Sequence, residues 1–148
     1  MFDDFEDESP TDPIETSPRP RVLVVEDDDA LREMISNRLH RDAFEVLEAG
    51  SGFEALRVLG SPLAAELELI IMDVHMPGAS GLEVAQWLRG GSCQVPILLI
   101  TAFPTTEVCR RASLLDCAVL AKPFQFERLT NAGIAALVSS RFEPRTAS

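Results

Sequence analysis

The stretch Leu69-Ile70-Ile71-Met72-Asp73 places four apolar side chains directly before one carboxylate. Three further apolar runs have the same layout and are each closed by polar or charged side chains: residues 22–25 by Glu26 and Asp27, residues 97–100 by Thr101, and residues 118–121 by Lys122. Short apolar runs separated by helical patterns are typical of buried parallel strands. Because the carboxyl ends of such strands share one edge of a doubly wound sheet, we expect these polar groups to converge there.

Amphipathic patterns between the runs predict helices. Their apolar positions recur every three or four residues, as one face of a helix requires: Leu31, Met34, Ile35 and Leu39; Phe53, Leu56 and Leu59; Leu82, Ala85, Trp87 and Leu88; and Phe126, Leu129, Gly133, Ala136 and Leu137. A further helix is expected from about residue 105 to 115, and residues 44–47 are expected to form the second strand. Asp28 or Asp29 and Ser51 are suited to cap the first two helices. Five alternating strand and helix units predict a three-layer α/β sandwich.

Composition limits the partners and the location. The net charge of −11 disfavours direct contact with nucleic acid or anionic membranes. No apolar stretch approaches the roughly 20 residues of a spanning helix, and the acidic start does not resemble a secretory signal. Cys93, Cys109 and Cys117 are odd in number and lack metal-type spacing, so we expect reduced thiols in a cytoplasmic protein.

The first twenty residues differ from the rest of the chain. They hold seven acidic residues, four prolines and few side chains that could build a core. Such a composition predicts a disordered acidic extension over residues 1–20. We expect one folded domain over residues 21–138 and a short tail over residues 139–148.

The polar groups at the strand ends suit a divalent cation and a phosphoryl group. Mg²⁺ prefers oxygen ligands, which Asp27 and Asp73 could supply, with Glu26 assisting directly or through water. Asp73 would also be the nucleophile that forms an aspartyl phosphate. Thr101 and Lys122 would donate to the phosphoryl oxygens and offset their charge.

Each of these residues also has a simpler interpretation. The acidic cluster at 26–28 could serve merely to cap the first helix. Asp73 and Thr101 could be ordinary strand-end residues, and Lys122 could be a surface cation. Complementary chemistry at four separate strand ends favours a site over that set of coincidences. For His75, a solvated loop histidine is the better interpretation of the side chain, and its backbone carbonyl is the more useful group.

Together these residues resemble the receiver domain of two-component response regulators. The resemblance spans residues 21–138 and rests on residues 24–28, Asp73-Val74-His75-Met76-Pro77 with Gly81, Thr101-Ala102, and Lys122-Pro123-Phe124. It implies a flavodoxin-like fold of five strand–helix units with strand order 2-1-3-4-5. It also implies that Asp73 accepts phosphate from a histidine kinase or histidine phosphotransfer protein. Mg²⁺ would then be held by Asp27, Asp73 and the carbonyl of His75, with Glu26 assisting, and the bond between Lys122 and Pro123 would be cis.

Three positions depart from the pattern of that family. Receivers usually carry an aromatic residue three positions before the lysine, where this chain has Val119. The small residues that usually precede the fifth strand are replaced by Leu114-Leu115-Asp116-Cys117, and Glu26 stands where Asp is more frequent. We therefore expect phosphorylation to move the loop from Thr101 to Phe103 and the helix after it, with Phe103 as the candidate substitute for the missing ring.

The sequence thus predicts a stand-alone receiver that docks to a downstream protein, as a monomer or a phosphorylation-dependent dimer. The expected docking face comprises the helix near residues 105–115, the fifth strand and the last helix. A phosphoacceptor of this kind is not a turnover enzyme. Two alternatives stay open at this point: a pseudo-receiver that no longer cycles phosphate, and a small Mg²⁺-dependent phosphohydrolase of the haloacid dehalogenase type.

Overall fold

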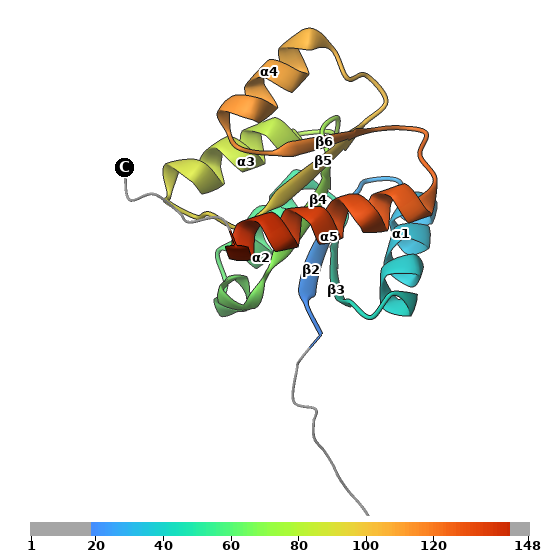
Figure 1. The fold of residues 1–148 in the computed structure, drawn as a ribbon. Helices are drawn as coiled ribbons and strands as arrows, with labels where there is room; N and C mark the ends of the chain where they lie inside the picture. Colours follow the sequence, from blue (N-terminus) through green and yellow to red (C-terminus); the bar gives the residue numbers. More distant parts are fainter. Residues whose placement is uncertain (1–18, 143–148) are drawn as a thin grey trace, which may run out of the picture.

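Five parallel strands form one sheet at the centre of the molecule (Figure 1). The computed structural model describes residues 19–142, so the extension predicted over residues 1–20 lies almost wholly outside the described residues. The order across the sheet is β3-β2-β4-β5-β6, which confirms the order 2-1-3-4-5 when the described strands are counted along the chain. The strand bounds are β2 Arg21–Val25, β3 Glu45–Ala49, β4 Leu69–Asp73, β5 Ile97–Thr101 and β6 Ala118–Ala121.

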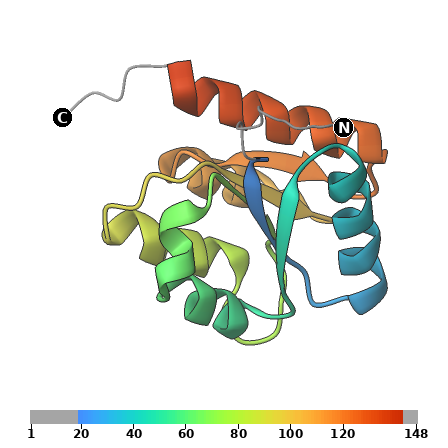
Figure 2. The ribbon, with the colours of Figure 1, turned by 90° about the horizontal axis from the view of Figure 1, so that it is seen from below.

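Helices cover both faces of the sheet, which gives the predicted three layers (Figure 2). On one face lie α1 (Asp29–Arg41) and α5 (Phe126–Phe142). The other face is covered by α2 (Gly52–Leu59), α3 (Gly81–Gly90) and α4 (Thr106–Leu114), and a short 3-10 helix, η2 (Pro62–Glu66), leads from α2 toward β4. Among the helices of residues 19–142, none combines the length and the apolarity that crossing a membrane requires.

The interiors of the central strands β2, β4 and β5 are apolar because both faces of each strand are covered. In β2, Leu23 and Val25 pack toward α2, α3 and α4, while Val22 and Val24 pack toward α1 and α5. Every residue of β4 and β5 is buried. In these three strands, polar side chains therefore appear only at the ends.

Side-chain caps start the helices where the sequence suggested. The carboxylate of Asp28 accepts hydrogen bonds from the amides of Ala30 and Leu31, at 3.0 and 3.1 Å, and so caps α1. The Ser51 hydroxyl caps α2 by accepting from the amide of Glu54. Each cap satisfies an amide that has no partner inside its own helix.

Three residues expected on buried helix faces are exposed instead. Met34 on α1 and Trp87 on α3 are each 53% exposed, and Phe53 on α2 is 63% exposed. The Phe53 ring lies over Gly78 in the loop after β4, where a Cβ atom would come within 2.7 Å of the ring. Periodicity predicts the apolar stripe of a helix, but the neighbouring elements decide how much of that stripe is covered.

Some element bounds also differ from the expectation. The second strand is 45–49 rather than 44–47, with Phe44 buried just before it. Its first amide, that of Glu45, donates to the carbonyl of Pro20 at 2.9 Å, so the sheet contacts begin one residue before Arg21. At the other end, α5 continues to Phe142, past residue 138.

Candidate functional site

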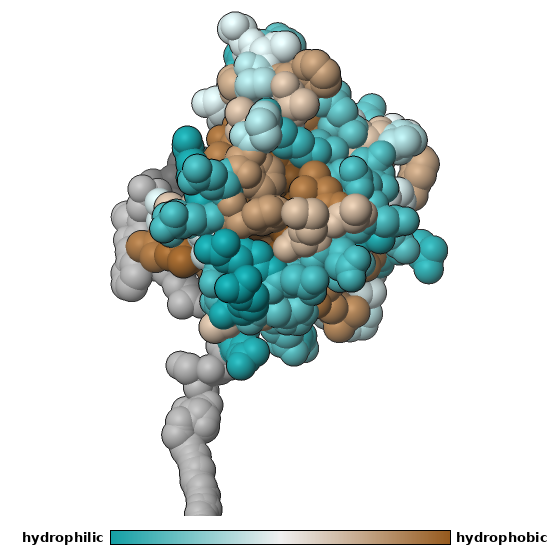
Figure 3. All heavy atoms as spheres, turned by 90° about the vertical axis from the view of Figure 1, so that its right-hand side faces the viewer, coloured by the Kyte–Doolittle hydropathy of each residue, from teal (hydrophilic) through white to brown (hydrophobic). Residues whose placement is uncertain are grey.

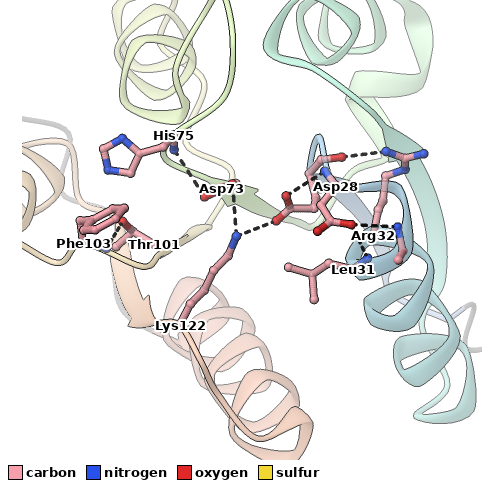
Figure 4. Close-up of polar contacts among 10 residues, drawn as sticks. Asp28, Leu31, Arg32, Asp73, His75, Thr101, Phe103 and Lys122 are labelled. Carbon is pink, nitrogen blue, oxygen red and sulfur yellow. Dashed lines mark hydrogen bonds and ion pairs between the residues drawn. The ribbon is translucent and has the colours of Figure 1, made fainter.

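The predicted site residues meet at the carboxyl edge of the sheet (Figure 4). Asp73 is the last residue of β4 and Thr101 the last of β5. Glu26 directly follows β2 and Lys122 directly follows β6. Each of the four is therefore held at a fixed strand end, and strand pairing sets their spacing.

Lys122 connects the two buried carboxylates. Its Nζ donates to Oε1 of Glu26 at 3.0 Å and to Oδ2 of Asp73 at 3.2 Å. Glu26 is 1% exposed and Asp73 5%. The amide of Lys122 donates to the carbonyl of Thr101 at 2.7 Å, and the peptide bond between Lys122 and Pro123 is cis, as predicted. A single ammonium thus offsets two carboxylates in a partly water-excluded space.

The other contacts of Glu26 hold it in place from the α1 side. Its Oε2 accepts from the amide of Asp28 at 3.1 Å, and its backbone carbonyl accepts from Nη1 of Arg32 at 2.8 Å. Arg32 also donates to the carboxylates of Glu48 and Asp29. No sequence pattern singles out Arg32, because its spacing of three residues from Asp29 is that of an ordinary surface pair on a helix.

The shifted pKa values follow from burial and charge. Burial raises the pKa of the Glu26 carboxyl above its ordinary value, and the charge of Asp73 acts in the same direction. For Lys122, burial lowers the pKa, but the bonds and charges of Glu26 and Asp73 outweigh it, so that this pKa is raised. The ammonium is therefore fully charged at neutral pH, as an electrostatic role requires.

Three carboxylates form the part of the site that could hold a cation. Oxygen atoms of Glu26, Asp27 and Asp73 lie within 4.8 Å of one another, and Asp27 is exposed to solvent. A set of carboxylate oxygens with one side open to water fits Mg²⁺, which keeps several of its waters when bound. The predicted contribution of the His75 carbonyl stays a prediction.

Thr101, Phe103 and His75 form the other half of the site. The Thr101 hydroxyl is buried, and its oxygen accepts from the amide of Phe103 at 2.9 Å. The exposed Phe103 ring meets the His75 ring edge-on, with centroids 5.6 Å apart and planes at 81°. The His75 amide makes a long contact of 3.4 Å to Oδ1 of Asp73. One chain of contacts therefore joins Thr101 to Asp73 across the loops after β4 and β5.

Val119 does not reproduce the ring that receivers usually carry. It is partly buried and packs inward against the apolar cluster beneath α4. The loop before β6 is fastened by Arg89 of α3, whose guanidinium donates to the carbonyls of Leu115 and Asp116. The same group donates to the carbonyls of Cys93 and Val95, so one side chain holds two loops. No sequence pattern indicates this role, because the carbonyls come from different segments.

The loop after Asp73 requires glycine at two positions. A Cβ atom on Gly81 would lie 2.3 Å from the carbonyl oxygen of Asp73. Gly78 has a φ of 79°, a conformation that L side chains rarely adopt. These glycines let the start of α3 pack directly against the end of β4, which helps to hold Asp73 in position.

Comparison with known proteins agrees with this geometry. Residues 22–133 match the family model described as the response regulator receiver domain. The chain belongs to this family. Receiver domains are phosphoacceptor signalling modules rather than turnover enzymes, so the phosphohydrolase alternative is not supported.

The chain is similar to curated regulators that are considerably longer than it. It is 39% identical to the uncharacterized transcriptional regulatory protein YrkP of Bacillus subtilis (strain 168). The 119 aligned residues cover 79% of this chain and 49% of YrkP. It is 38% identical over 112 residues to the response regulator MprA of Mycobacterium tuberculosis (strain H37Rv), covering 74% of this chain and 46% of MprA. The chain thus spans about half the length of these relatives.

Solved receiver structures share the fold. The Vibrio cholerae chemotaxis protein CheY4 has a TM-score of 0.72 and 30% sequence identity, over 80% of this chain and 98% of CheY4. A CheY-like receiver domain protein from Methanospirillum hungatei has a TM-score of 0.78 at 20% identity, over 85% of this chain and 99% of that chain. The second likeness shows the fold alone.

Proposed function

We propose that Asp73 accepts a phosphoryl group from a histidine kinase or a histidine phosphotransfer protein, in a reaction that depends on Mg²⁺. The observation that carries this proposal is the Lys122 ammonium between Asp73 and Glu26, next to a cluster of three carboxylates. A purely structural ion pair would not need the third, exposed carboxylate of Asp27. The complete set of groups also favours a cycling phosphoacceptor over the pseudo-receiver alternative.

In the proposed transfer, a carboxylate oxygen of Asp73 attacks the phosphorus atom. A new bond between phosphorus and oxygen forms as the bond from phosphorus to the histidine nitrogen of the donor breaks, and that nitrogen keeps the electron pair. Lys122 exchanges its contact with Asp73 for one with a phosphoryl oxygen. The Thr101 hydroxyl, whose oxygen accepts from the Phe103 amide, keeps its own proton free to donate to another. Mg²⁺, held by Asp27, Asp73 and Glu26, would neutralise charge on the phosphoryl oxygens.

The phosphodonor needs a docking surface beside the site. Figure 3 looks onto the right-hand side of Figure 1, where β6 runs into α5, and shows apolar side chains gathered between polar ones. The first turns of α1 and α5 carry the partly buried Leu31 and Phe126, with Phe124 edge-on to Phe126 at 5.7 Å. We assign the donor to this patch and to the exposed Met34, which lies about one helical turn after Leu31 on α1. Met34→Glu should weaken transfer from a protein donor while leaving phosphorylation by acetyl phosphate unchanged.

We propose that the downstream protein docks on the face made by α4, β6 and α5, as the sequence predicts. Leu114, Ile134 and Val138 are exposed apolar side chains on these helices. The negative net charge supports a protein rather than a nucleic acid as the direct partner. The stand-alone organisation, the cytoplasmic location and a phosphorylation-dependent dimer stay predictions.

The proposal is tested by phosphorylating the full chain with acetyl phosphate and Mg²⁺ and measuring the intact mass. One phosphoryl group should be added to the native chain and none to Asp73→Asn. Asp116→Asn, which alters an exposed carboxylate before β6, is the matched control and should behave like the native chain. Equal modification of Asp73→Asn would refute the proposal, and no modification of any variant would support the pseudo-receiver.

A further inference from the structure

An apolar groove lies at the edge of the sheet opposite to Asp73. It has a volume of about 730 Å³ and runs between the η2 region and the end of α3. Its walls include Leu59, Ala65, Leu67, Trp87, Cys93 and Val95. A space of this size and character is typical of ligand sites. None of the residues that we assign to phosphorylation lines it.

Trp87 makes the groove unusual for a surface feature. Its side chain is 53% exposed, although tryptophan is the largest apolar side chain and burying it in a fold gains the most contact area. The exposed rim beside the buried Leu88 leaves room for a partner that would cover the indole. Exposed apolar surface of this kind marks an interaction site when something on the molecule can reach it.

The start of the chain enters the sheet beside this groove. Arg21, the first residue of β2, forms an ion pair with Glu66 of η2, and its carbonyl accepts from the amide of Glu68. Glu66 directly precedes Leu67 of the groove wall. Both the start of β2 and η2 lie toward the lower end of Figure 1. Residues 1–18 are therefore attached within a short distance of the groove.

The segment of residues 1–18 has side chains that match the groove. Its aromatic residues are Phe2 and Phe5, three positions apart, close enough along the chain for both rings to reach one groove. Thirteen residues, 6–18, separate Phe5 from Arg19. A linker of that length has an end-to-end distance on the order of 20 Å and a maximum reach of about 45 Å. The seven acidic residues of the segment would stay in water while the two rings enter the groove.

We propose that Phe2 and Phe5 of the same chain occupy this groove and cover Trp87. Tethering gives the segment an effective concentration on the order of 1 mM, so that an untethered dissociation constant of about 1 mM already gives half occupancy. The contact would bring the acidic segment over the amino edge of the sheet, away from the site of phosphorylation. The inference does not depend on the function proposed for Asp73.

The fluorescence of Trp87 tests the proposal directly, because the chain has one tryptophan and no tyrosine. In the full chain, the double substitution Phe2→Ser and Phe5→Ser should shift the emission to longer wavelength and increase quenching by acrylamide. Adding a peptide of residues 1–8 to that variant should reverse the shift in a saturable manner. The matched control is Phe103→Ser, which removes an exposed ring at the opposite edge of the sheet and should leave the emission unchanged.

Two results would overturn the proposal. Identical emission and quenching in the native chain and the double variant would mean that the rings do not cover the indole. A shift that depends on protein concentration would assign the groove to a second copy of the chain. Because the substitutions lie outside the described domain, a circular dichroism spectrum equal to that of the native chain should accompany every measurement.

Discussion

The two halves of the phosphoacceptor site are held in different ways. In the acidic half, the partly buried Lys122 after β6 contacts the buried Glu26 after β2 and the buried Asp73 of β4, at 3.0 and 3.2 Å. In the half formed by the loops after β4 and β5, one hydrogen bond from the Phe103 amide to Thr101 and one ring contact to His75 connect exposed loops. Breaking a charged contact in a buried place costs more than breaking an exposed ring contact.

This difference suggests that the two halves have different roles. The acidic half holds the groups proposed to react with phosphate in a fixed geometry, and it matches the receiver pattern closely. The other half departs from that pattern, because Val119 replaces the usual ring and packs inward. A segment held by few contacts can change its conformation at a low cost in free energy. We therefore expect phosphorylation to change the conformation of the loop that contains Thr101 and Phe103.

The largest effect should come from the residue that joins the charges. Lys122→Ala removes the ammonium that would contact the phosphoryl group, and should slow phosphorylation by acetyl phosphate about 100-fold or more. Lys122→Arg, which keeps the charge, should retain more of the rate. The rate is measured by intact mass over time, with circular dichroism as the folding check. An unchanged rate in the folded alanine variant would make Lys122 a structural cation only.

The loss of Mg²⁺ affinity should differ between substitutions of the two carboxylates Asp27 and Glu26. Asp27→Asn should weaken binding most, by on the order of 100-fold, and Glu26→Gln by about 10-fold, because Glu26 already uses its oxygens on Lys122 and the Asp28 amide. Isothermal titration with MgCl₂ gives both values. The opposite ranking would mean that Glu26 is the main ligand.

Amide exchange should show the contrast between the halves. With beryllofluoride and Mg²⁺ bound, we expect changed protection from Thr101 to Leu115, since Thr101 must reorient toward the added group while the Phe103 amide is bonded to it. Phe103→Ala should reduce the change in α4 without abolishing the change at Asp73. Protection changes limited to the surroundings of Asp73 would leave the chain without the proposed switch.

The pH dependence of the free energy of unfolding should reveal the raised pKa of the buried Glu26 carboxyl. The pKa of Glu26 is raised above 4.5, so the folded state binds its proton more tightly than the unfolded state does. This contribution to stability is fully present below pH 4.5 and is lost as pH rises through the folded pKa. In urea unfolding without Mg²⁺, the native chain should therefore lose stability relative to Glu26→Gln as pH rises from 4.5. A difference that is constant with pH would contradict the raised pKa.

The smallest effect on the site should follow deletion of residues 2–18. The seven acidic residues and the prolines in residues 1–20 give no route to a core, and the described sheet contacts begin at Pro20. The rate of phosphorylation should stay within about two-fold of the native chain, the size of an ordinary surface change. A melting temperature tens of degrees lower would show that the segment is part of the fold.

The sequence alone identified the strands and their polar ends. Uninterrupted apolar runs such as residues 97–100 occur where both faces of a strand are covered, and the charge at the end of each run is local information. Capping residues such as Ser51 are equally local, because the side chain bonds to an amide three residues away. For this reason Glu26, Asp73, Thr101 and Lys122 could be placed together from the order of the elements.

Only the tertiary structure decided which contacts these groups make. Lys122 and Glu26 are 96 positions apart, and no sequence pattern encodes the 3.0 Å between them. The exposure of Met34 and Phe53, and the four carbonyls that Arg89 holds together, likewise depend on how neighbouring segments pack. Periodicity reports the preferences of one element, whereas burial and hydrogen bonding at a site are properties of several elements brought together.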